Sequence, residues 1–140
     1  MTAPPRPTRA TYLAVTRGVK VEVTPRFLPD QSDPSRARYA WAYTVRIENG
    51  GPLALQLVSR RWIITDALNR VEEVEGAGVV GEQPTLGPGE AFEYTSGCPL
   101  STPSGMMRGA YRMLTASGDS FEAEIPEFSL HLPEAARRLN

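Results

Sequence analysis

The sequence contains one cysteine and one histidine, and it has no long apolar run. The single cysteine, Cys98, excludes an internal disulfide. With His131 as the only histidine, a tetrahedral zinc site would need carboxylates for most of its ligands. A membrane-spanning helix needs about 20 consecutive apolar residues, whereas apolar runs such as Trp62-Ile63-Ile64 are short and lie between charges. We therefore expect no membrane span, no metal site and no cofactor.

The chain also lacks an excess of charge of either sign, with 15 basic and 16 acidic residues and a formal net charge of -1. Nucleic-acid-binding proteins usually carry a basic excess, so no nucleic-acid partner is expected. The first ten residues, MTAPPRPTRA, include two arginines but no apolar centre, which is unlike a secretory signal. Together with the single cysteine, this predicts a cytoplasmic protein. A length of 140 residues fits one domain with its own core.

What the sequence does have is a recurring alternation of apolar and polar residues, the period of half-buried strands. The clearest case is YAWAYTVRIENGG, where every second residue from Tyr39 to Ile47 is aromatic or β-branched and Asn49-Gly50-Gly51 supplies a turn. Similar stretches occupy residues 19–24, 53–66, 70–75, 90–96, 106–125 and 128–132. Hairpin turns are expected at Asp66-Ala67-Leu68-Asn69 and at Ser117-Gly118-Asp119. About seven to eight short strands without a long helix predict an all-β protein, an antiparallel β-sandwich of immunoglobulin or fibronectin type III type. A small closed barrel is the alternative.

The remaining segments set the expected boundaries. Residues 1–10, rich in Pro, Thr and Arg, are predicted to be a disordered tail, residues 11–133 the folded domain, and residues 134–140 a short helical turn or tail. Two segments rich in breakers are predicted to be loops: 26–38 and 96–105. The alternation in 53–66 changes phase around Ser59 to Arg61, which predicts a β-bulge.

One glycine-rich stretch matches a nucleotide-binding pattern. Gly76-Ala77-Gly78-Val79-Val80-Gly81 reads G-x-G-x-x-G, the fingerprint of dinucleotide-binding folds. The fingerprint requires a following helix and an acidic residue about 20 positions later. Here Pro84 and Pro88 prevent a helix, and no Asp or Glu occurs from Thr95 through Gly118. A dinucleotide-binding fold is therefore excluded.

Two interpretations of the glycines remain open. Consecutive backbone N–H groups can bind an anion without a helix, and nearby arginines could add charge-assisted hydrogen bonds. The candidate phosphate or pyrophosphate ligands are Gly76, Gly78, Gly81, Arg60 and Arg61, with Arg70 and Arg112 as further arginines. The alternative, which we favour, is that the glycines permit a tight crossing between two sheets.

The residues that could perform chemistry are few. His131 alternates with Leu130 and Leu132, which places it on the solvent-facing side of a strand. Cys98 lies in a predicted loop with no histidine nearby in the sequence to activate it. An acidic cluster could hold Mg²⁺ weakly, but alternation separates its members, and such clusters more often protect a strand edge; it comprises Glu72, Glu73, Glu75 and Glu82. We assign no catalytic residue and predict that the protein is not an enzyme.

Several segments resemble one known family. They are Arg60-x-Trp62-x-Ile64, the run VEEVEGAGVVGEQPTLGPGEAFEYTSG, the run from Thr102 to Met113, and Phe121-x-x-x-Ile125-Pro126. Across about residues 18 to 132 the chain resembles the ApaG (CorD) family. The resemblance implies a fibronectin type III-like sandwich, an association with cobalt resistance and magnesium efflux in bacteria, and partner binding in eukaryotic F-box and polymerase-interacting proteins. It implies no enzymatic activity, and it offers the glycine motif as a pyrophosphate site.

The chain departs from the family at two positions. Arg61 stands where many members carry histidine, which removes a metal ligand and favours an anion. Asn69 stands where many members carry glycine, a mild change. The expected function is a non-enzymatic binding module linked to divalent-cation homeostasis that acts through a protein partner, with a homodimer as a further candidate. The alternative is a pyrophosphate- or nucleotide-binding protein, or a hydrolase, that uses the glycine stretch with Arg60 or Arg61.

Overall fold

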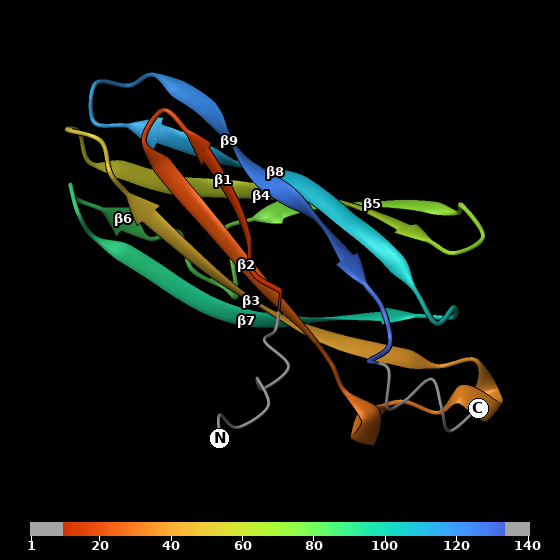
Figure 1. Cartoon of the computed structure of the whole chain (residues 1–140). Helices are drawn as coiled ribbons and strands as arrows, with labels where there is room; N and C mark the ends of the chain where they lie inside the picture. Colours follow the sequence, from red (N-terminus) through yellow and green to blue (C-terminus); the bar gives the residue numbers. More distant parts are fainter. Residues whose placement is uncertain (1–9, 134–140) are drawn as a thin grey trace, which may run out of the picture.

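The computed structural model describes residues 10–133, which form two antiparallel sheets packed face to face (Figure 1). The strands in chain order are β1 (Tyr12–Thr16), β2 (Val19–Phe27), β3 (Tyr39–Asn49), β4 (Leu55–Asp66), β5 (Val71–Ala77), β6 (Thr85–Leu86), β7 (Ala91–Leu100), β8 (Gly105–Thr115) and β9 (Ser120–Leu130). One sheet has the order β1-β2-β3-β7, and the other has the order β5-β4-β8-β9 with β6 also paired to β4. The predicted all-β sandwich is confirmed. The described residues hold one strand more than the upper expectation, and β6 has only two residues.

The core lies between the sheets, where the predicted alternation places the apolar side chains. Val19, Val21 and Val23 of β2 are fully buried. At the centre the Trp62 ring meets the Phe128 ring edge to face at 6.0 Å and lies 5.0 Å from the Tyr43 ring. Aromatic rings bury large apolar areas, and edge-to-face pairs add a further attraction of about 1 kcal/mol. The alternation in β2 and β3 therefore predicted the core face correctly.

The predicted loop at 96–105 is only partly a loop. Residues up to Leu100 belong to β7, where Trp41 is paired with Cys98, so Cys98 lies in a strand and is buried. The prediction gave too much weight to Gly97 and Pro99, two residues that are exposed within the strand. A proline is tolerated in an edge strand when its missing N–H would have faced away from the neighbouring strand. The loop itself is limited to residues 101–104.

The glycine stretch does not make the crossing between the sheets, contrary to the interpretation favoured from the sequence. β5 and β6 both pair with β4, so the chain stays beside β4 from Val71 to Leu86 and loops out only at residues 78–84. The passage to the other sheet comes later, at residues 87–90, where Glu90 N donates to Gly87 O at 3.0 Å. Periodicity cannot distinguish an interrupted strand from a crossing, because both look like a break in the alternation.

The predicted hairpin turns and the bulge are present, and the chain turns after β3 at Gly50 and Gly51 without a positive φ at either glycine. The β4–β5 hairpin places Asn69 at a φ of 62°, and the β8–β9 hairpin places Gly118 at a φ of 94°. The register between β4 and β8 shifts between Leu57 and Ser59, slightly earlier than the phase change predicted. The loop expected at 26–38 begins after β2 ends at Phe27, and it contains two short 3₁₀ turns. The predicted tails at 1–10 and 134–140 fall outside the described residues, except for Ala10.

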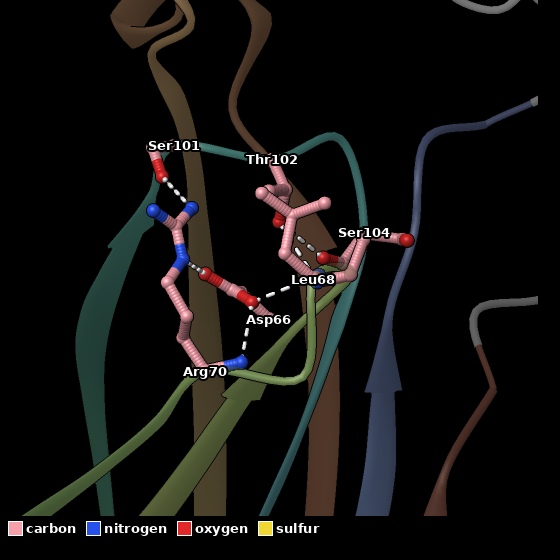
Figure 2. A network of polar contacts seen from close by, with 7 residues as sticks. Asp66, Leu68, Arg70, Ser101, Thr102 and Ser104 are labelled. Carbon is pink, nitrogen blue, oxygen red and sulfur yellow. Dashed lines mark hydrogen bonds and ion pairs between the residues drawn. The ribbon is translucent and has the colours of Figure 1, made fainter.

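A polar network joins the β4–β5 hairpin to the loop between β7 and β8 (Figure 2). The Asp66 carboxylate accepts hydrogen bonds from Leu68 N and Arg70 N, both at 2.9 Å, and from Arg70 Nε at 2.6 Å. Arg70 Nη2 also donates to Ser101 Oγ at 2.9 Å. Desolvation acts to raise the pKa of Asp66, but the hydrogen bonds from Arg70 and Leu68 outweigh it and leave that pKa below its usual value. The start of β5 is thereby held against the end of β7.

Candidate functional site

Arg60 and Gly76 face each other on neighbouring strands, in register between β4 and β5. The Arg60 guanidinium lies across Gly76, because a Cβ built on Gly76 would come within 2.7 Å of Arg60 Nη1. That same Nη1 donates to Ala77 O at 3.1 Å and to Gly78 O at 2.9 Å. Arg60 therefore fastens the end of β5 to β4 through two charge-assisted hydrogen bonds. A side chain at Gly76 would have to displace the Arg60 guanidinium.

The other two glycines shape the turn that follows. Val79 N donates to Glu82 O at 2.8 Å, and Glu82 N donates back to Val79 O at 2.9 Å. Between them Val80 and Gly81 both have positive φ, 43° and 80°, as in the tight turns that favour glycine. Gly78 N donates to Val58 O at 2.8 Å. The N–H groups of Gly78, Val79 and Glu82 thus have backbone acceptors while the turn is formed.

Arg61 points to the opposite, outer face of the sheet, beside Glu75 of β5 and Ala110 of β8. Its Nη1 lies 3.8 Å from Glu73 Oε1, a long ion pair between two exposed side chains. Its Nε is buried and has no hydrogen-bond partner among the described residues. A buried donor without an acceptor costs about 1 to 3 kcal/mol, so a conformation that offers Nε an acceptor would be favoured.

Next to Arg61 the outer face of the sheet has a depression of about 430 Å³. It is lined by Ser59, Arg60, Arg61, Glu75, Gly76, Ala110, Arg112 and Glu122. A smaller depression of about 260 Å³ continues on the other side of Arg61, toward Arg108 and Glu124. Three of the five predicted ligand residues, Arg60, Arg61 and Gly76, therefore line one cavity, whereas Gly78 and Gly81 do not.

The larger depression combines the guanidinium groups of Arg61 and Arg112 with the carboxylates of Glu75 and Glu122, whereas the Arg60 guanidinium lies across Gly76. Guanidinium groups bind carboxylate and phosphate oxygens through paired hydrogen bonds. The two carboxylates limit the net positive charge, so the arrangement suits a small anion or a group that carries both signs. Sequence reasoning missed Glu122 and Ala110, which lie far along the chain from the glycines. The alternation of Arg108, Ala110 and Arg112 is the one signal that could have placed them on a shared face.

A buried pair of tyrosine hydroxyls, one from β7 and one from β8, lies between the two sheets. Tyr94 and Tyr111 hydrogen-bond to each other through their hydroxyl groups. Burial raises the pKa of Tyr94. Burial, with the Tyr94 charge as a further cause, raises the pKa of Tyr111 well above its ordinary value. Both hydroxyls stay protonated at neutral pH. Each hydroxyl is the hydrogen-bond partner of the other in the core, and neither serves as a base.

The acidic residues of β5 divide between two faces. Glu73 and Glu75 stand opposite Ile63 and Arg61 on the outer side, whereas Glu72 stands opposite Ile64 on the inner side. Within residues 10–133 no three His, Cys, Asp or Glu side chains converge on a point where a metal ion could bind. In the same part of the chain, no helix is long and apolar enough to cross a membrane.

Cys98 and His131 differ in exposure. The His131 side chain is exposed, as predicted, and Cys98 is 4% exposed. Burial, with the nearby Glu72 charge as a smaller cause, raises the pKa of the Cys98 thiol from 9.0 to about 11. Because the thiolate is the reactive form, the thiol is a poor nucleophile at neutral pH.

We predict that Cys98 in the folded protein reacts with iodoacetamide about 100-fold more slowly at pH 7.5 than in the urea-unfolded chain, because the higher pKa lowers the thiolate fraction by that factor. The rate should rise as the pH approaches 11. Mass spectrometry of the alkylated protein over time measures it. Equal rates in the folded and unfolded chains would show that Cys98 is an accessible nucleophile.

The fold and the site define an antiparallel β-sandwich with an arginine-lined depression beside a glycine-rich excursion of one edge strand. Residues 29–115 match the ApaG domain family. The chain is 58% identical to Protein ApaG of Caulobacter vibrioides over 131 residues, which cover 94% of each chain. It is 57% identical to Protein ApaG of Bradyrhizobium diazoefficiens, over 92% of this chain and 99% of that protein. The chain belongs to the ApaG family.

Solved structures agree with this assignment. A Bordetella pertussis protein described as ApaA superposes with a TM-score of 0.80 at 54% identity, covering 91% of this chain and 99% of that one. The C-terminal domain of Wzt superposes with a TM-score of 0.54 at 11% identity, which shows a shared sandwich fold and no more. The resemblance read from the sequence is thereby confirmed.

Proposed function

We propose that this chain is a cytoplasmic binding module that performs no chemistry of its own and acts through a protein partner. The observation that carries the proposal is the state of its reactive groups. Cys98 is buried with its pKa raised to about 11, and the Tyr94 and Tyr111 hydroxyls are paired in the core. Arg60 is occupied in holding the glycine stretch. What the surface offers instead is charged side chains and exposed strand edges, which are features of recognition.

The proposed biological setting is divalent-cation homeostasis, namely cobalt resistance and magnesium efflux. It rests on membership of the ApaG family, whose bacterial members the resemblance links to these processes. Since the described residues do not gather carboxylates or imidazoles around one point, the module would act on a cation-handling partner.

A strain that lacks the gene is expected to tolerate less cobalt than its parent, and a plasmid copy should restore growth. The measurement is growth against CoCl₂ concentration, with NaCl as the control for general stress. Unchanged tolerance in the deletion strain would contradict the cation link. Co-purification of one stoichiometric partner without any cation phenotype would leave a pure interaction domain.

The second candidate function is binding of pyrophosphate, free or within a nucleotide, near Gly76, Gly78, Gly81, Arg60 and Arg61. The observation that favours it is that Arg60, Arg61 and Gly76 line one depression together with Arg112. Gly78 and Gly81 would contribute through the shape of the turn beside it. A hydrolase would in addition need a base or a metal-activated water.

Calorimetric titration with pyrophosphate, ATP and diadenosine tetraphosphate, with and without Mg²⁺, tests this candidate. Saturable binding that is lost in Arg61→Ala and retained in Gly81→Ala would support it, since Arg61 lines the depression and Gly81 does not. Absence of heat with all three ligands would remove it. Mg²⁺-dependent turnover of any of them would overturn the non-catalytic proposal.

A further inference from the structure

Within residues 10–133, three of the four sheet edges of the sandwich are protected. β1 and β9 lie side by side (Figure 1), and Glu124 N of β9 donates to Thr16 Oγ1 of β1 at 3.1 Å. These two edges therefore cover each other. Natural proteins protect sheet edges in this way, or with charges and irregularities, because an unpaired strand offers its N–H and C=O groups to any other chain.

β5 is protected by charge and by its short length. It has seven residues, three of which are glutamates, and the excursion at residues 78–84 interrupts it before pairing resumes at β6. Arg61 of β4 forms an ion pair with Glu73 of β5. Repeated charge on an edge strand discourages the addition of a further strand that lacks the opposite charge.

β7 is the exception. It has ten residues, pairs only with β3 among the described residues, and keeps one register from Ala91 to Leu100 without a bulge. Its single charged residue is Glu93. Asn49 N donates to Glu90 O at 2.9 Å, so Glu90 and every second residue after it turn their backbone groups toward β3. The backbone groups of Ala91, Glu93, Thr95 and Gly97 therefore point away from the sheet.

We infer that β7 is the docking edge of this module and that it accepts an added β-strand from another protein, one with basic side chains on its outer face and apolar side chains on its inner face. This inference rests on the proposed function as a partner-binding module, for which it names the surface and the chemistry of the partner. The free N–H and C=O groups supply the pairing, and the side chains around the edge select the sequence.

The charges around the β7 edge select a basic strand. Glu93 points outward from β7. Arg70 ties the start of β5 to Ser101, just beyond the end of β7, and Glu72 stands on the inner side of β5, which faces the sheet of β7. Glu72 is near enough to Cys98 of β7 to affect its titration. A second copy of this chain would place its own carboxylates against these, so a basic partner fits and a homodimer through β7 does not.

The inner side of the same opening selects apolar residues. Phe92 of β7 and Val74 of β5 are only partly buried, and both pack against the core from this side. A strand added to β7 would turn every second side chain toward them. Covering them stabilises the complex by roughly 25 cal/mol per Å² of apolar surface removed from water. This stabilisation adds to that of the backbone hydrogen bonds.

The test uses a capped decapeptide of alternating lysine and valine, matched to the ten residues of β7, and ¹⁵N-labelled full-length protein. Amide hydrogen exchange at Glu93, Thr95 and Gly97 should slow about tenfold at a peptide concentration ten times Kd. Thr95→Pro removes one outward N–H and should weaken binding about tenfold or more. Thr95→Val is the matched control. Both substitutions remove the Thr95 hydroxyl, but only Thr95→Pro also removes the backbone N–H.

Two further peptides and one further variant complete the design. An alternating glutamate–valine peptide and a lysine–valine peptide with its residues in separate blocks should bind at least tenfold more weakly. Glu93→Lys should reverse the preference between the lysine and glutamate peptides, and it tests the edge even if Thr95→Pro fails to fold. Equal binding to Thr95→Pro and Thr95→Val, protection at β5 instead of β7, or concentration-dependent dimerisation through β7 would each overturn the inference.

Failure of this inference can be told apart from failure of the proposed function. If the Thr95→Pro chain folds, loses peptide binding and still restores cobalt tolerance to a deletion strain, the module acts through another surface. If wild-type protein binds the peptide but the deletion strain shows no cation phenotype, the docking edge is supported and the proposed cellular role is contradicted.

Discussion

Gly78→Ala is expected to destabilise the protein by about 3 kcal/mol or more, whereas Gly81→Ala is expected to cost about 1 kcal/mol. A Cβ at Gly78 would come within 2.1 Å of Glu82 O, the atom that closes the turn with Val79 N. At Gly81 nothing lies within 4 Å of the added Cβ. Both glycines have positive φ, so the difference between them isolates the clash from the backbone preference.

Urea unfolding followed by tryptophan fluorescence gives both free energies of unfolding, since Trp62 of β4 is only 3% exposed in the core. The two variants carry the same chemical change and serve as controls for each other. Equal, small losses would show that the turn relaxes without cost. The glycine motif would then be free of a structural role, which would strengthen its assignment to a ligand.

The second large effect is expected at adjacent arginines. Arg60→Ala should lower the free energy of unfolding by about 2 kcal/mol, because it removes two hydrogen bonds from a charged donor and leaves two carbonyl oxygens without that donor. Arg61→Ala should cost less than about 0.5 kcal/mol, because its only ion pair within the described residues spans 3.8 Å and is exposed. The two residues are neighbours in sequence and face opposite sides of β4.

Hydrogen exchange adds a local readout to the same pair of variants. The amide of Gly78, bonded to Val58 O, should exchange faster in Arg60→Ala and at the wild-type rate in Arg61→Ala. Arg61→Ala is in turn the variant expected to affect anion binding without disturbing the fold. If both arginines prove equally dispensable for stability, Arg60 is not a clamp and becomes available as a ligand residue.

These contrasts show how far the sequence could predict the candidate site. It selected Arg60, Arg61 and Gly76, which the structure places around one depression, and it grouped Gly78 and Gly81 with them by spacing alone. Spacing carries no information about which N–H groups already have acceptors. The hydrogen bonds of Gly78, Val79 and Glu82 belong to a turn whose partner strand, β4, precedes it by about twenty residues.

Two predictions were wrong for the same reason: the loop expected around Cys98 and the sheet crossing expected at the glycine stretch. Gly97 and Pro99 suggested a loop. The backbone groups of both residues point away from β3, so a missing N–H or side chain there does not interrupt the pairing. Gly76 and Gly78 suggested a crossing, but β4 continues to pair on both sides of the excursion. In each case the neighbouring strand, and not the local residue type, decided the conformation.

The sequence by itself determined the all-β class, the faces of β2 and β3 that form the core, the hairpins at Asn69 and Gly118, and membership of the ApaG family. These depend on the period of the apolar residues and on local backbone preferences, which are properties of short segments. Only the tertiary structure decided that Arg60 holds the glycine stretch while Arg61 faces outward, and that β7 keeps an unprotected edge. Both depend on which strands become neighbours, and strand pairing joins segments that lie far apart in the chain.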